Sequence, residues 1–110
     1  MSEIVRQVPF PFSGGRFPSE LGAVVQRTVV DGELPALIVI HDDDGDWLIG
    51  DDVTDASDPA ASVISHVRHL VDRDPSIEET AGLSCGYAAR RSSRSAPWAI
   101  EKWSYVDEDA

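Results

Sequence analysis

The chain is poor in the residues that cross-link a fold or anchor it in a membrane. Cys85 is the only cysteine among 110 residues, so an internal disulfide is impossible and a reducing compartment is favoured. The longest apolar run, residues 34–40, contains Pro35 and is far shorter than the roughly 20 residues of a membrane-spanning helix. Residues 1–6 lack the apolar segment of a signal peptide. We therefore expect a cytoplasmic protein without membrane contact.

Positive charge is also scarce, since 9 lysines and arginines stand against 20 aspartates and glutamates, which gives a net charge of −11. Such a chain repels the phosphates of nucleic acids and the surface of anionic lipids, so neither is an expected partner. A basic protein is the macromolecular partner that this charge favours, although acidity also serves solubility alone.

The negative charge is concentrated between residues 42 and 58, where eight aspartates occur with no positive residue between them. We predict that seven of them form a protein-binding surface: Asp42, Asp43, Asp44, Asp46, Asp51, Asp52 and Asp55. The arginines of the last third, Arg90, Arg91 and Arg94, are the alternative partners of this cluster within the fold.

The hydrophobic content of 42% predicts one ordinary core. Residues 1–22 contain Pro9, Pro11 and Pro18 and are expected to form an irregular arm. Three phenylalanines between residues 10 and 17 would anchor this arm on the domain. Residues 23–104 are expected to form a single α+β domain, and residues 105–110 an acidic tail.

Three strands are expected first, at residues 23–30, 36–40 and 47–49, because β-branched or continuously apolar residues occur there between turn residues. Asp31-Gly32 and residues 42–46 supply the turns, so the three strands predict an antiparallel meander. Two later segments, residues 86–91 and 98–103, are also predicted to be strands.

The main helix is expected to begin at Asp58-Pro59 and to end at Asp74-Pro75. Apolar residues recur between these points at helical spacing, at Ala60, Val63, Ile64, Val67, Leu70 and Val71. A short helical turn is predicted at residues 76–79. The whole pattern predicts an α+β fold in which an antiparallel sheet of about five strands carries one main helix on one face. The expected core residues are Trp47, Trp98, Val39, Ile49, Val63, Ile64, Val67 and Leu70.

Candidate catalytic and metal-binding residues are few. Aligning Gly45 with the glycine of a calcium-binding loop places Ile40 at the first ligand position, so no metal site is predicted there. The histidines and one aspartate leave open a small hydrolase or metal-dependent enzyme that uses His41, Asp44 or His66. Cys85 becomes a candidate nucleophile only beside a group such as Arg90 or a histidine. No cofactor is expected.

The chain also resembles a group of short bacterial proteins of unknown function. The resemblance rests on the run from His41 to Gly50, the helix ending in Asp74-Pro75-Ser76, the segment Gly86 to Arg90 and the closing Pro97-Trp98, and it covers about residues 24–98. These motifs imply a shared fold but indicate no particular catalytic or binding activity. Cys85 stands where that group more often has proline, which argues against a required thiol. Chains of this size and acidity also resemble small immunity proteins of toxin systems.

The leading functional hypothesis is therefore a non-enzymatic, immunity-like domain that binds a basic protein through the aspartate cluster. The enzyme described above is one alternative. The other is a scaffold or subunit that docks on a larger complex through the exposed aromatic arm Phe10–Phe17.

Overall fold

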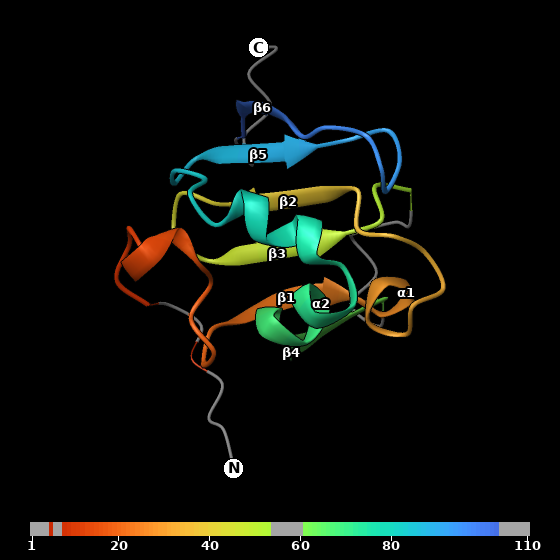
Figure 1. The fold of residues 1–110 in the computed structure, drawn as a ribbon, viewed down its shortest axis with the longest axis horizontal. Coiled ribbons are helices and arrows are strands. Elements are labelled where there is room, and N and C mark those ends of the chain that lie inside the picture. The colour runs from red at the N-terminus through yellow and green to blue at the C-terminus, as the bar shows by residue number, and fades with distance from the viewer. Residues whose placement is uncertain (1–4, 6–7, 54–60, 104–110) are drawn as a thin grey trace.

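The computed structural model describes Val5, residues 8–53 and residues 61–103. These residues form a mixed six-stranded sheet in the order β4-β1-β3-β2-β5-β6, accompanied by short helices (Figure 1). The strands are β1 (Gly22–Gln26), β2 (Ile38–His41), β3 (Trp47–Gly50), β4 (Ser62–His66), β5 (Tyr87–Arg90) and β6 (Ala99–Lys102). The helices are α1 (Arg27–Val30), α2 (Val67–Arg73) and the 3-10 helices η1 (Ser13–Gly15) and η3 (Pro75–Thr80). The α+β prediction is confirmed, whereas the purely antiparallel sheet and the single main helix were wrong.

The predicted meander is wrong at its first strand. Strand β1 ends at Gln26, and the next four residues turn into helix α1 instead of continuing the strand to Val30. The chain then passes over one strand position before it forms the antiparallel hairpin of β2 and β3. Strand β3 fills that position and lies parallel to β1, with Val25 opposite Ile49. Only the β2–β3 hairpin of the expected meander is therefore present.

The predicted main helix is in fact a strand followed by a helix. Residues 62–66 form β4, which pairs antiparallel with β1 along all five residues. Only the second half of the expected helix, α2, is helical, and it buries Val67, Leu70 and Val71. The helical spacing of the apolar residues led to a wrong prediction for this segment, because β-branched Val63 and Ile64 suit a strand equally well. The expected start of the helix at Asp58-Pro59 and the expected acidic tail at 105–110 lie outside the described residues.

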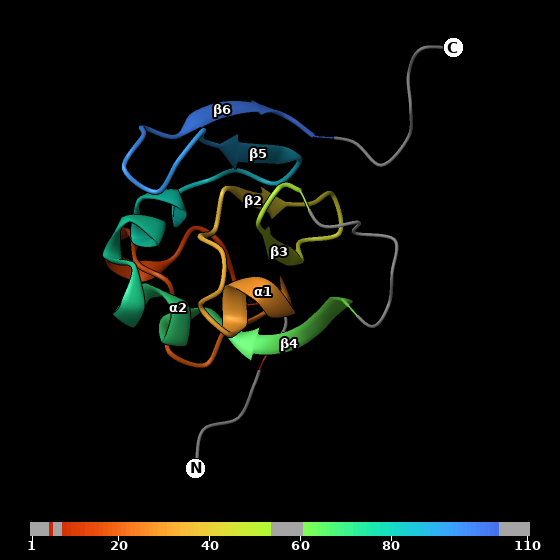
Figure 2. The same ribbon diagram turned by 90° about the vertical axis from the view of Figure 1, so that its right-hand side faces the viewer.

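The main core lies on one face of the sheet, under α2 and η3 (Figure 2). Of the residues predicted for the core, Trp47, Val39, Ile49, Val67 and Leu70 are buried there. Trp98 is half-buried and packs against this core, Val63 is also half-buried, and Ile64 is 43% exposed. Ile64 was misplaced because a strand, unlike a helix, turns neighbouring side chains to opposite faces.

The N-terminal arm is part of the same core. Phe12 and Phe17 are buried, and their rings contact the ring of Trp47 with centroid distances of 5.8 and 5.1 Å. The backbone of Phe17 is held at both ends, since its N–H donates to Glu78 at 2.7 Å and its carbonyl accepts from Arg68 at 2.6 Å. The arm was predicted to be anchored by its phenylalanines and they are packed inward, so Phe12 and Phe17 are not exposed for docking elsewhere.

Candidate functional site

The turn between β2 and β3 is built around Asp42. Its side chain is buried, and Oδ1 accepts hydrogen bonds from the backbone N–H groups of Asp44 and Asp46, both at 2.9 Å. Gly45 adopts a φ of 88°, which the tight reversal requires and which glycine tolerates without strain. Asp42 therefore stabilises the turn from within, in the manner of aspartates in other tight turns.

Asp51 has a similar structural role at the other end of β3. Its side chain is 1% exposed and accepts from the hydroxyl of Thr28 at 2.5 Å and from the N–H of Val53 at 2.9 Å. The N–H of Asp51 donates to the side-chain amide of Gln26 at 2.7 Å. These bonds tie the end of β3 to the junction of β1 and α1.

The remaining predicted aspartates fall into two places. Asp43 and Asp44 are exposed and Asp46 is half-buried, all in the turn before β3. Asp52 follows β3 and forms an ion pair with Arg90 at 2.9 Å. A strand of four residues spans about 13 Å, so the two groups lie at opposite ends of β3. Asp55 lies outside the described residues. The six described residues of the predicted seven thus divide into a buried pair, three aspartates of the turn before β3, and one aspartate that is paired with Arg90.

His41 contacts Cys85, and a histidine was one of the neighbours that the sequence analysis considered for this thiol. The imidazole is 2% exposed and stacks on the indole of Trp47 with a centroid distance of 4.0 Å. Its Nδ1 lies 2.7 Å from the carbonyl oxygen of Leu83, so Nδ1 carries the proton and donates it. Nε2 is then the acceptor, and the exposed thiol of Cys85 lies 3.5 Å from it. The pair is arranged so that the imidazole can accept the thiol proton.

The structure does not bring the proposed enzymatic residues together. His41 is at the end of β2 and faces the core, whereas His66 is at the end of β4 and lies on the other face by its register with Gly22. Three strand spacings, roughly 14 Å, separate these two strands. Within the described part of the chain, no three His, Cys, Asp or Glu side chains are grouped so that they could hold a metal ion.

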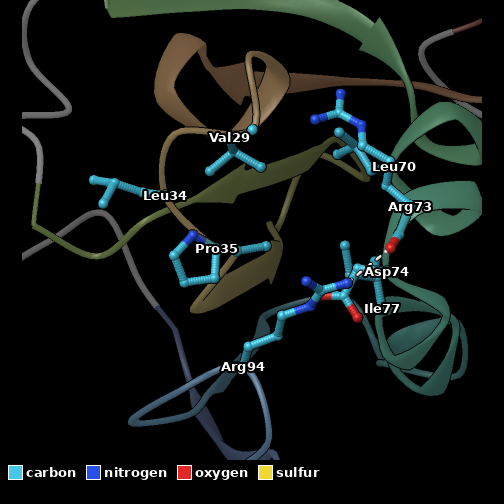
Figure 3. A pocket seen from close by; sticks show the side chains of 10 residues that line it. Val29, Leu34, Pro35, Leu70, Arg73, Asp74, Ile77 and Arg94 are labelled. Carbon is cyan, nitrogen blue, oxygen red and sulfur yellow. Dashed lines mark hydrogen bonds and ion pairs between the residues drawn. The ribbon is translucent and has the colours of Figure 1, made fainter.

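A cavity of about 250 Å³ lies between α1, the loop before β2 and the end of α2 (Figure 3). Its apolar lining includes Val29, Leu34, Pro35, Leu70 and Ile77. Two arginines, Arg73 of α2 and Arg94 of the loop between β5 and β6, complete the lining together with Asp74. Sequence reasoning did not identify this cavity, because its two arginines are brought together only by the folding of distant loops.

Asp74, which lines that cavity, forms an ion pair with Arg91. The Arg91 side chain is fully buried, and it donates to the carbonyl of Ala36 at 2.9 and 3.0 Å and to Asp74 at 2.9 Å. Its guanidinium also lies 4.0 Å from the ring centre of Trp98. Burial alone would raise the pKa of Asp74, but hydrogen bonds from Ser76 and Arg91 and the charges of Arg91 and Arg94 hold it below its ordinary value.

The face of the sheet opposite the main core is also apolar, and we call it the outer face. Strand register places one residue from each of five strands in a row across it: Ile64, Val24, Leu48, Ile40 and Ala88. The buried apolar side chains of α1, α2 and η3 all belong to the opposite core. Within this row Ile40 and Ala88 are buried, and with Ile38 they form a small second core against which Leu48 and Trp103 pack. Val24 and Leu48 are half-buried, and Ile64 is 43% exposed.

A groove of about 260 Å³ lies at the middle of this row, where Val24, Leu48 and Ile40 line it together with Ile38 and Trp103. Its rim carries Arg90, which forms ion pairs with Asp52 at 2.9 Å and with Glu101 at 2.7 Å. Two carboxylates thus share one guanidinium, and this part of the rim keeps a net negative charge.

Comparisons of the chain with protein-family models, with curated proteins and with solved structures found no match. The helices among the described residues are all too short or too polar to cross a bilayer.

Proposed function

We propose that this chain is a protein-binding domain that receives a basic partner on the outer face of its sheet. The single observation that supports the proposal is the accessible apolar part of this row, where Ile64 is 43% exposed and Val24 and Leu48 are half-buried. An apolar surface with a polar rim is the usual anatomy of a protein interface.

Charge complementarity supports a basic partner. The net charge is −11, and Arg90 in the lining of the groove is paired with two carboxylates, Asp52 of the same lining and Glu101 of β6. The exposed Asp43 and Asp44 add negative charge at the far end of β3. These groups would accelerate association with a cationic protein, while apolar contacts on the outer face would supply most of the affinity. A basic toxin that is neutralised by binding is the kind of partner that the resemblance to immunity proteins suggests.

The test begins with capture of a partner on the immobilised chain, followed by calorimetry of the purified pair. The variant Ile64→Asn removes an apolar side chain from the outer face, whereas Ile100→Asn removes a similarly exposed one, 58% against 43%, from the other face. We expect Ile64→Asn to weaken binding by roughly tenfold, as for a residue within an interface, and Ile100→Asn to leave it unchanged.

A binding constant equally insensitive to both variants would rule out the outer face as the interface. An affinity that did not fall as salt was raised from 50 to about 300 mM would rule out a basic partner, because salt screens attraction between exposed charges.

A further inference from the structure

The cavity beside α2 has the composition of a binding site for a small anion. Its walls are apolar, from Val29, Pro35 and Ile77, and two arginines reach it from separate segments of the chain (Figure 3). Its volume of about 250 Å³ is slightly below the roughly 300 Å³ at which pockets for drug-sized ligands begin. The cavity therefore suits a compact molecule that has both an apolar and a charged part.

The charges around the cavity leave an excess of positive charge. Asp74 is the one carboxylate in the lining, and it is already bound by the buried Arg91 at 2.9 Å. Arg94 approaches the same carboxylate at 3.5 Å, and Arg73 donates to the neutral carbonyl of Val30. Two guanidinium groups thus pair with one carboxylate, and the third, that of Arg73, lines the same cavity without pairing with it.

The two arginines of the lining retain hydrogen-bonding capacity. A guanidinium has five N–H donors in a planar fork that matches a carboxylate. Among the described contacts, Arg94 uses Nη2 for the carbonyl of Arg73 at 2.8 Å and Nε for Asp74. Arg73 uses Nη2 for Val30. The exposed neighbours Asp31, Glu33 and Asp72 do not line the cavity.

We propose that this cavity binds a small carboxylate with an apolar body, such as an aryl carboxylate. Its carboxylate would bind Arg94 and Arg73, and its ring would pack on Val29, Pro35 and Ile77. A monoanion is favoured over a phosphate because each added negative charge is opposed by the field of a chain with net charge −11. The proposal is independent of the protein-binding function, since the cavity lies on the side of the helices and away from the outer face.

The experiment is a calorimetric titration of the full chain with phenylacetate. Ligands of this size bind with dissociation constants on the order of 0.1–1 mM. Arg94→Gln and, separately, Arg73→Gln are expected to weaken binding by roughly tenfold, because each removes a charge-assisted hydrogen bond. Lys102→Gln is the matched control, since it removes the same charge from exposed strand β6. The neutral analogue phenylacetamide and inorganic phosphate are both expected to bind at least tenfold more weakly.

Failure of phenylacetate to bind would overturn the proposal, as would equal loss of affinity in Lys102→Gln and the two arginine variants. Phenylacetamide binding as tightly as phenylacetate would show that the arginines are not used. Phosphate binding as tightly would show a site for anions in general. Because Arg94 is 61% exposed, its replacement is expected to leave the fold intact, which the circular dichroism spectrum of each variant checks.

Discussion

Single polar residues connect segments that are far apart in the sequence. Arg91 joins the carbonyl of Ala36 to Asp74 and the ring of Trp98, so it ties together the loop before β2, the start of η3 and the loop before β6. Glu78 ties the N-terminal arm to η3 through the N–H of Phe17 and through Arg68. Both carboxylates are paired and largely shielded, so they matter more to stability than exposed ion pairs do.

These two carboxylates predict how stability depends on pH. Burial tends to raise their pKa values, but hydrogen bonds and nearby arginines outweigh burial and lower both below the ordinary values. A carboxylate whose pKa is lower in the folded state than in the unfolded state stabilises the fold at pH values above the unfolded pKa. This stabilisation is lost as the pH falls through the folded pKa. The free energy of unfolding, measured by urea titration, should therefore decline as pH is lowered from about 5 toward 2.

The variant Asp74→Asn tests the contribution of one of them. It leaves the buried Arg91 without a charged partner and should lower the free energy of unfolding at pH 7 by about 3 kcal/mol. The variant should also show a shallower decline between pH 5 and 2 than the parent chain. Asp43→Asn, at an exposed position in the aspartate turn, serves as the control and should change stability little. Identical pH profiles for Asp74→Asn and the parent chain would contradict this assignment.

The contact between His41 and Cys85 predicts the reactivity of the thiol. Because Nε2 is held as an acceptor 3.5 Å from Sγ, Cys85 should react with iodoacetamide at pH 7 roughly tenfold faster than an equally exposed thiol without such a neighbour. The comparison is the double variant Ser84→Cys, Cys85→Ser, which moves the thiol by one exposed position and keeps His41. Equal alkylation rates for the two thiols would show that the imidazole does not assist.

At the scale of elements, the sequence predicted β2, β3, β5, β6 and η3 close to their observed positions. These elements are bounded by turn residues, such as Gly45, or by a capping aspartate such as Asp74 before Pro75. The errors occurred where a strand passes directly into a helix, from Gln26 to Arg27 and from His66 to Val67. No glycine or proline marks either junction, so a single strand or a single helix fits each apolar pattern and only pairing in the sheet decides.

The candidate sites also depend on contacts between distant residues, which the local sequence pattern does not predict. The aspartates were visible as a cluster, but the bonds that bury Asp51 come from Thr28 and Gln26 on another strand and helix. His41 meets Cys85 because β2 pairs with β5, and the arginine cavity forms where two loops meet α2. Each of these contacts joins residues more than 20 positions apart, and local patterns carry no information about them.

At the scale of the whole molecule, the sheet has two unlike faces. One is covered by α2, η3 and the N-terminal arm, and on the other Ile64 is exposed and Val24 and Leu48 are half-buried. The net charge of −11 of the whole chain favours mutual repulsion between identical chains, and on the proposed function it would attract a cationic partner.

The most direct test is a methyl chemical-shift map of the chain with and without its captured partner. We predict that the methyl signals of Val24, Leu48 and Ile64 on the outer face shift most, while those of Ile100 and of Val67 and Leu70 in α2 stay in place. Shifts concentrated on α2 and Ile100, with Val24, Leu48 and Ile64 unchanged, would contradict it.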